Sequence, residues 1–303
     1  MKKPLASVIL PTFNREATIE KAIRTVLNQT HDQLELIVVD DGSQDGTESI
    51  VNGIKDPRLT FIKAPSNQGA GAARNIGLSH AQGDYILFQD SDDEWMAEKI
   101  ETHLKAHARH EDKEVVTYCA FYKWNGKTRE YGPRTGAKNG KVLEHTLTKN
   151  IAPTLSLCVP KSCMAEVGPF DETLKYSIDH DFVIRLAQKF EFSFIDQPLY
   201  IYNATDSHQR ISTQKKFSSH GYKTMLAKHG ALFSKYPQAL ADYHYKIGKT
   251  DFLNGQAGYR KHLTAAVQTR FKFKYLLFLC ATFLGREKVN TLMAHRGALG
   301  RNR

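Results

Sequence analysis

Long hydrophobic runs are missing from this sequence. The longest, residues 275–284, is about half as long as the ~20 residues that a membrane-spanning helix needs, and it contains Thr282. A shorter apolar stretch near the N-terminus stops at Pro11 and Asn14 and forms no signal-peptide core. We therefore expect a cytoplasmic protein in which residues 275–284 can lie on a bilayer without crossing it.

Cysteine is scarce, and its spacing carries no motif. There is no CxxC pair, no histidine at metal-ligand spacing and no dense disulfide framework, so we expect four reduced thiols in the core. The cysteines are Cys119, Cys158, Cys163 and Cys280. The sequence also lacks a GxxxxGK(S/T) phosphate loop, an HExxH zinc motif and the ligand pattern of an EF-hand.

Acidic residues become rare toward the C-terminus. The 303 residues include 42 Lys and Arg against 32 Asp and Glu, a formal net charge of +10, and carboxylates are sparse after Asp251. That end of the chain should favour an anionic surface, and we expect no nucleic-acid partner. With 41% hydrophobic residues, the chain is suited to one large α/β domain with an appendage, and disorder is excluded.

Strand and helix patterns alternate through residues 1–112. Such alternation predicts an α/β fold with a mostly parallel sheet and helices on both faces. The expected strands are 7–10, 34–39, 59–62 and 85–88. The first expected helix begins near Asn14, and three more span 47–54, 70–80 and 95–110.

The pattern after residue 113 is less regular. It indicates strands at 115–124 and 154–159, a helix over 178–190, a short pair of strands at 192–195 and 199–202, and helices beyond 212. We therefore predict one domain over 1–212, with a nucleotide-binding half (1–112) and an acceptor half (113–212), followed by a basic helical extension over 213–303.

Polar clusters follow three of the expected strands, where a parallel sheet binds its ligands. They are residues 11–15, 40–43 and 89–93. In an extended segment Asp90 and Asp92 would point the same way, toward one ion or toward an ion and a ribose, with Ser91 facing away. Carboxylate oxygens suit Mn²⁺ or Mg²⁺. The alternative is a solvated acidic turn in which Asp93 caps the helix at Trp95.

Two further candidates are a carboxylate and a cation. Asp41 ends an apolar strand, where it can accept hydrogen bonds from a ribose or a base, although Asp-Gly-Ser also suits a plain turn. The small residues 69–73 let a helix approach a ligand closely, with Arg74 as a fixed cation. A dinucleotide-binding interpretation fails because Arg74 fills the third glycine position and the motif follows the third strand.

An acidic pair opens the expected helix at 178. Transfer to a hydroxyl acceptor favours a carboxylate base within reach of the attacking oxygen. Asp179, at the start of the expected helix, is placed to act as this base. Asp181, two residues on, points elsewhere. The helix dipole favours acids at this end in any case, so a base and a helix cap both remain open.

Taken together, these segments resemble glycosyltransferase family 2, inverting enzymes of GT-A fold. The matching segments are 7–15, 38–47, 71–77 and 89–93, and the resemblance covers roughly the first 210 residues. It implies that Asp92 binds the metal, with Asp90 near the ion or the ribose, and that Asp179 is the catalytic base. The family's Glu before that base is replaced by Ile178. His208 is a candidate to reach the metal or phosphate, although a solvated loop histidine is the alternative.

The resemblance also implies a nucleotide-sugar site. The backbone near Pro11 and the ring of Phe13 would hold uracil, Asp41 would accept the base N–H, and Arg74 would contact base or phosphate. The full set assigned to the nucleotide-sugar is Pro11, Thr12, Phe13, Arg15, Asp41, Arg74, Asp90 and Ser91.

The implied activity is metal-dependent transfer, with inversion, from a UDP-sugar to a saccharide or lipid-linked saccharide in lipopolysaccharide, capsule or other surface-glycan synthesis. A nucleotidyl or phosphoryl transferase would need a lysine or glycine-rich loop after the first strand, where only Arg15 occurs. An inactive membrane scaffold is the third hypothesis. Lys272, Lys274 and Arg286 flank residues 275–284 and suit an interfacial helix on anionic lipid, and a buried core helix or a dimer contact are the alternatives.

Overall fold

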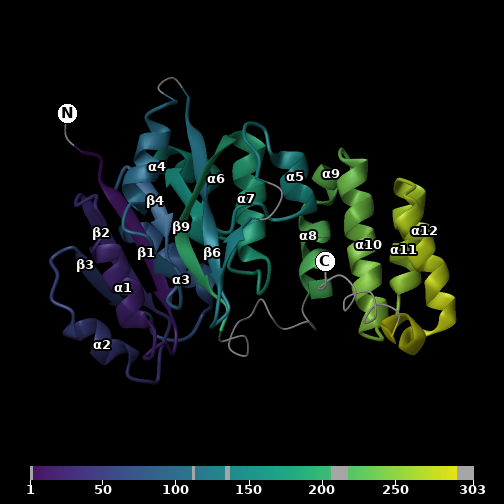
Figure 1. Ribbon diagram of the computed structural model, residues 1–303, viewed down its shortest axis with the longest axis horizontal. Coiled ribbons are helices and arrows are strands. Elements are labelled where there is room, and N and C mark those ends of the chain that lie inside the picture. The colour runs from purple at the N-terminus through teal and green to yellow at the C-terminus, as the bar shows by residue number, and fades with distance from the viewer. Residues whose placement is uncertain (1–2, 111–112, 134–136, 206–217, 292–303) are drawn as a thin grey trace. The chain divides into compact units, whose positions relative to one another are not determined.

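The computed structural model describes residues 3–110, 113–133, 137–205 and 218–291. The chain divides into two compact units, residues 1–209 and 210–303. The first contains a sheet of nine strands, and the second is helical (Figure 1).

Four parallel strands form the first half of the sheet, in the order β3-β2-β1-β4. The apolar runs in these strands are buried, as expected for parallel strands between helices, except in the edge strand at residues 59–63, which is partly exposed. They are β1 (Ala6–Thr12), β2 (Leu34–Asp40), β3 (Leu59–Lys63) and β4 (Tyr85–Phe88), and the helices are α1 (Ile19–Leu27), α2 (Thr47–Gly53), α3 (Ala70–His80) and α4 (Lys99–His107).

The sheet continues beyond β4 with antiparallel and parallel pairs, in the order β4-β8-β6-β9-β5, and β7 pairs with β6. These strands are β5 (Glu94–Trp95), β6 (Val115–Trp124), β7 (Arg129–Gly132), β8 (Leu157–Pro160) and β9 (Glu191–Asn203). The helical elements of this half are α5 (Leu143–Thr148), the 3-10 turn η1 (Thr154–Ser156), α6 (Lys161–Val167) and α7 (Ile178–Lys189). The prediction of a mostly parallel α/β sheet is confirmed.

Two hydrophobic clusters occupy the two faces of the sheet. Successive side chains of a strand point to opposite faces, so Ile9 of β1 joins the cluster under α3 and α7, whereas Val8 and Leu10 join the cluster under α1. Both clusters continue across β2 and β4. The packed sheet therefore supports the loops at the carboxyl ends of its strands.

Four local predictions were wrong. The expected strand at 154–159 begins as the 3-10 turn η1, and only the part after it forms a strand, β8. The first helix begins at Ile19 instead of near Asn14, because Asn14 adopts a left-handed backbone (φ 50°) in a loop. The fourth helix begins at Lys99, since residues 94–95 form a strand that pairs with β9. The expected pair at 192–195 and 199–202 is one strand, β9, which follows β6 with interruptions in register near Ala120.

The second unit confirms the predicted C-terminal helices. They are α8 (Ser218–Lys228), α9 (Gly230–Phe233), α10 (Pro237–Leu253), α11 (Tyr259–Thr269), α12 (Phe273–Ala281) and the 3-10 turn η4 (Thr282–Leu284). Across the described residues, none of the helices has the length and hydrophobicity needed to span a membrane. Cys280 of α12 is exposed, so the expectation of four core thiols holds only for the other three.

Close packing of α3 on β1 gives a test of this fold. A Cβ on Gly77 would lie 2.5 Å from Cγ2 of the buried Ile9, whereas nothing lies within 4 Å of a Cβ on Gly53 of α2. Alanine favours a helix at both positions, so the clash separates them. We expect Gly77→Ala to lower the free energy of unfolding by about 1–3 kcal/mol and Gly53→Ala to leave it unchanged or raise it, measured by urea denaturation. Equal effects would contradict this packing.

Candidate active site

The loops that follow β1 and β2 are joined by hydrogen bonds. The backbone N–H of Asp41 donates to the carbonyl of Thr12 (2.8 Å), and that of Asn14 donates to Ser43 Oγ (2.8 Å). The N–H of Gln44 donates to the side-chain oxygen of Asn14 (2.8 Å). The left-handed conformation of Asn14, which asparagine tolerates better than most residues, makes this link possible.

Asp41 fixes the start of α3. Its buried carboxylate accepts the backbone N–H groups of Gln68 (2.8 Å) and Gly69 (2.7 Å), and Gly69 has a positive φ of 97° that suits glycine. These bonds set where α3 begins and therefore where Arg74, one turn further on, lies. The expected contact of Asp41 with a base remains a prediction.

Arg74 connects two of the acidic residues expected from the sequence. Its guanidinium lies 3.0 Å from the carboxylate of Asp90, which follows β4, and 3.4 Å from that of Asp179 at the start of α7. Only 7% of the Arg74 side chain is exposed, and its guanidinium also lies over the ring of Phe170. About a third of each carboxylate stays exposed, so both remain open to a ligand.

Charges and burial act together here. Burial alone would lower the pKa of Arg74, but the carboxylates of Asp179 and Asp90 outweigh it and raise that pKa. Burial raises the pKa of Asp90, Arg74 opposes this, and the charges of Asp179 and Asp92 add to the rise. Two carboxylates thus pair with one buried cation, and the charge of Asp92 acts on Asp90 as well, which leaves the cluster with an excess of negative charge.

The acidic segment is a turn. The N–H of Asp93 donates to the carbonyl of Asp90 (3.2 Å), so the extended geometry from which we expected Asp90 and Asp92 to point the same way is not present. The carboxylate of Asp93 accepts the N–H of Asn203 at the end of β9 (2.7 Å) instead of capping a helix. The turn is thereby tied to the opposite half of the sheet.

Asp179 lies where a general base is expected. It is the second residue of α7, and Ser177 before the helix holds a left-handed backbone (φ 61°), which is costly for a residue other than glycine. The hydroxyl of Thr154 donates to Asp179 Oδ2 (2.9 Å), while Arg74 contacts Oδ1. Both carboxylate oxygens therefore have a fixed orientation.

Sequence reasoning missed Thr154 and Lys99. Lys99 is fully buried, donates from Nζ to the carbonyl of Leu155, and lies 4.1 Å from the ring centroid of Trp95. Burial lowers its pKa to about 8. It holds the 154–156 turn that carries Thr154. A lysine on the inner side of an expected helix was the available signal, whereas nothing marks Thr154 in the sequence.

The neighbours of Asp179 have structural contacts. Asp181 is buried and pairs with Arg185 (3.0 Å), which confirms that it points away from Asp179's partners. Ile178, which replaces the family's Glu, packs into the hydrophobic cluster and would lie 3.7 Å from a Cβ on Gly71. The substitution thus places an apolar contact between α7 and α3.

The side chains present fit a metal site whose ligands come partly from the protein and partly from a bound diphosphate. No three His, Cys, Asp or Glu side chains in the described part of the chain form a group that could hold a metal ion. Asp90 and Asp92 offer hard oxygen ligands beside excess negative charge, and a bound diphosphate would supply further oxygens. His208, the other proposed ligand, lies outside the described residues.

The remaining residues assigned to the nucleotide-sugar lie in the same loops. Pro11 and Thr12 are buried at the end of β1, and the ring of Phe13 is 38% exposed. Arg15 donates to the Asn14 carbonyl (3.0 Å). Ser91 is 8% exposed. The exposed ring is the member of this set best placed to stack on a base.

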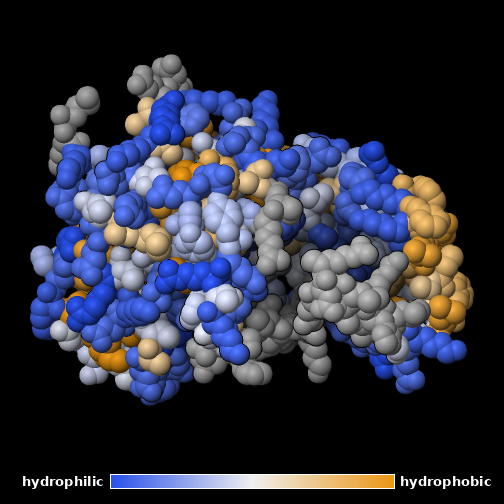
Figure 2. All heavy atoms as spheres, in the orientation of Figure 1, coloured by the Kyte–Doolittle hydropathy of each residue, from blue (hydrophilic) through white to orange (hydrophobic). Residues whose placement is uncertain are grey.

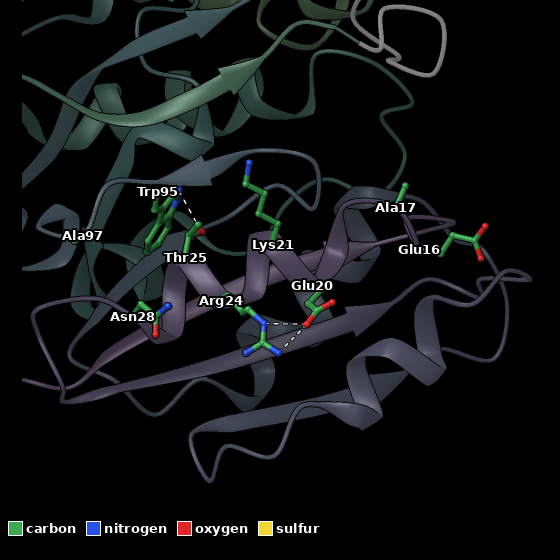
Figure 3. A pocket seen from close by; sticks show the side chains of 9 residues that line it. All are labelled: Glu16, Ala17, Glu20, Lys21, Arg24, Thr25, Asn28, Trp95 and Ala97. Carbon is green, nitrogen blue, oxygen red and sulfur yellow. Dashed lines mark hydrogen bonds and ion pairs between the residues drawn. The ribbon is translucent and has the colours of Figure 1, made fainter. Parts of the chain in front are cut away.

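A separate open hollow of about 440 Å³ lies along α1 (Figure 3). Its wall includes the ion pair of Arg24 with Glu20 (2.7 Å), and Trp95 lines its inner end. It contains none of the residues predicted to bind donor or metal. We assign no function to it.

Comparison with known proteins decides the family. Residues 7–174 match the family described as "Glycosyl transferase family 2". This chain belongs to glycosyl transferase family 2. The resemblance inferred from the four segments is therefore confirmed.

Two relatives of this family 2 chain illustrate the range. An uncharacterized glycosyltransferase of Haemophilus influenzae is 48% identical over 106 residues, which cover 34% of this chain and 42% of that protein. The Escherichia coli protein WfaP, named UDP-Glc:alpha-D-GlcNAc-diphosphoundecaprenol beta-1,3-glucosyltransferase, is 39% identical over 118 residues, 39% of this chain and 46% of WfaP. The chain spans about half the length of several curated relatives that it matches, from 42% to 57%.

Solved structures agree on the fold. S. aureus TarS in complex with UDP-GlcNAc has a TM-score of 0.61 at 17% identity and covers 88% of this chain and 89% of that one. The mannosyltransferase PcManGT of Pyrobaculum calidifontis, in complex with GDP-Man and Mn²⁺, has a TM-score of 0.57 at 17% identity and covers 94% and 87%. This family 2 chain thus has the GT-A fold followed by helices.

The Arg74 cluster predicts a stability effect. Arg74→Leu leaves Asp90 and Asp179 without their shared cation, and we expect the free energy of unfolding to fall by about 2 kcal/mol, less than for fully buried pairs because both carboxylates are partly exposed. Adding Asp90→Asn should restore part of this loss because it removes one unpaired charge. Chemical denaturation of wild type, Arg74→Leu, Asp90→Asn and the double variant measures it. Additive losses in the double variant would contradict the pairing.

Proposed function

We propose that this protein is a metal-dependent inverting glycosyltransferase that moves a sugar from a UDP-sugar to a hydroxyl acceptor in surface-glycan synthesis. The observation that carries the proposal is the contact of Arg74 with both Asp90 and Asp179. It brings the acidic turn after β4, where a metal and diphosphate would bind, next to the residue expected to act as base.

The donor is inferred from relatives. WfaP is named for a UDP-Glc donor, and TarS was solved with UDP-GlcNAc. The exposed ring of Phe13 and the loop fixed by Asp41 would hold the nucleoside. Arg74 lies 3.0 Å from Asp90, so a phosphate bound near Asp90 would also be within reach of its guanidinium. UDP-sugar recognition is therefore the expectation for this chain.

The metal would be Mn²⁺ or Mg²⁺, held by Asp92 with Asp90 and completed by the diphosphate of the donor. PcManGT was solved with Mn²⁺. The ion would neutralise charge that develops on the departing diphosphate. Arg74, already between Asp90 and Asp179, adds a fixed positive charge to the same region without needing to move.

Asp179 would take the proton from the acceptor hydroxyl. Arg74 and Thr154 fix both of its oxygens, while a third of the side chain stays exposed for an incoming acceptor. Proton removal lets the acceptor oxygen attack the anomeric carbon from the face opposite the nucleotide, which inverts the configuration. The acceptor class, a saccharide or a lipid-linked saccharide, follows the diphosphoundecaprenol acceptor in the name of WfaP.

Release of UDP tests this assignment. Wild-type protein, given a panel of UDP-sugars with Mn²⁺ or Mg²⁺, should turn over one donor only when metal is present. Asp92→Ala should abolish the response to metal, and Asp179→Asn should lower kcat about 10²- to 10⁴-fold while calorimetry still detects UDP binding. The surface variant Asp196→Asn is the control. Turnover that survives Asp179→Asn would remove the base role, and no binding of any UDP-sugar would overturn the proposal.

Thr154 is proposed to position the base. Thr154→Val removes the hydrogen bond to Asp179, and we expect kcat to fall about 5- to 10-fold with KM for the donor unchanged. Thr154→Ser keeps the hydroxyl and should restore kcat to within about twofold. Steady-state kinetics of the three proteins separate the effects. A valine variant with wild-type kcat, or a serine variant as slow as valine, argues against positioning.

A further inference from the structure

Exposed apolar side chains gather at one place in the second unit. Of seven large hydrophobic side chains exposed in the described part of the chain, five fall within residues 271–284. We call these the α12 patch, and their exposed fractions range from 51% to 72%: Phe271, Phe273, Leu277, Phe283 and Leu284. Figure 2 shows hydrophobic colour gathered over α12. Such a concentration marks an interaction surface.

Phe273 and Leu277 of the patch lie on the exposed side of α12, whose other side is packed, and the remaining three patch residues lie just before and just after this helix. Tyr275 of α12 is fully buried with Ala241 and Ala266, and its hydroxyl donates to Asp242 of α10. The alternative of a wholly buried core helix is therefore wrong for α12. Within the described residues 218–291, the five patch side chains are not part of this core, so the packing there gives no reason for their apolar character.

The segment of the sequence that contains the patch is strongly basic. Residues 252–303 contain 10 Lys and Arg and one carboxylate, Glu287, a net of +9, whereas residues 1–251 contain 32 basic and 31 acidic residues, a net of +1. Nearly the whole surplus of the chain therefore lies in this segment. The guanidinium of Arg260 lies 5.0 Å from the ring centroid of Phe283.

Local carboxylates do not cancel this charge. Lys272 and Lys274 each lie 3.6 Å from Asp242, so two ammonium groups share one carboxylate that also accepts the Tyr275 hydroxyl. The side chain of Lys274 remains 57% exposed. A ligand that suits this surface has an apolar interior and an anionic face.

We infer that the α12 patch docks the protein on a bilayer containing anionic phospholipid. The rings and leucines enter the interface while the basic side chains contact headgroup phosphates. If a second copy of the protein docked through the same face, the basic side chains beside the two patches would come together, and like-charge repulsion would oppose the contact. A nucleic acid would satisfy the charge but leave the five apolar side chains in water. This inference goes beyond the proposed transferase activity, and its test requires no sugar transfer.

Vesicle flotation tests the surface with the full chain. Wild-type protein should float with phosphatidylcholine vesicles that contain phosphatidylglycerol, should remain in solution with phosphatidylcholine alone, and should lose binding as salt is raised. Phe273→Ser combined with Phe283→Ser should lower the partition coefficient at least about tenfold, because both rings leave the interface. Arg270→Gln combined with Arg286→Gln should lower it by a similar factor and weaken the salt dependence.

Tyr131→Ser, at an exposed aromatic residue of the first unit, is the matched control and should float like wild type. Circular dichroism confirms folding of each variant, and both mutated rings are at least 70% exposed. Wild type that stays in solution with anionic vesicles, or a serine variant that floats equally well, overturns the inference. The inference is also overturned if light scattering detects a dimer of the wild-type protein that the serine substitutions disrupt, while the wild-type protein does not bind vesicles. Vesicle binding without UDP release would keep this inference and contradict the proposed function alone.

Discussion

The pairing of buried Arg74 with Asp90 and Asp179 is the constraint on which the site depends. A guanidinium that is almost completely buried needs carboxylates nearby, and these two are 89 residues apart in the sequence. One follows the parallel strand β4, and the other opens α7. Their shared partner therefore holds the expected donor side and the expected acceptor side of the site at a fixed separation, before any ligand binds.

The rest of the first unit serves to place that cation. Asp41 fixes the first residues of α3, and the absence of a side chain at Gly77 lets α3 lie directly on β1. Lys99 and Thr154 perform the corresponding task from the other side, since Lys99 holds the turn from which Thr154 reaches Asp179. Through contacts within the protein, Asp41, Lys99 and Thr154 thus determine the geometry of Arg74 and Asp179.

The sequence predicted the fold well where periodicity is strong and predicted contacts poorly where the chain folds back on itself. Strand β4 and helix α3 have the expected bounds because apolar repeats and glycine mark them. A helix cap was the alternative considered for Asp93, because its actual partner, Asn203, is 110 residues away in the sequence. Asp90 and Asp92 were assigned one direction because an extended segment was assumed, whereas residues 90–93 form a turn. The four motifs identified the family, but Thr154 emerges only from tertiary contacts, and so does the turn that Lys99 holds.

We propose that nucleotide and metal complete one site at the acidic turn beside Arg74. Titration calorimetry of Mn²⁺ into the wild-type protein, with and without UDP, tests it most directly. Because the described residues offer too few carboxylates to hold an ion alone, we predict weak Mn²⁺ binding without UDP and binding at least about tenfold tighter with it, a coupling of about 1.4 kcal/mol. Equal Mn²⁺ affinity in the two titrations would contradict the claim.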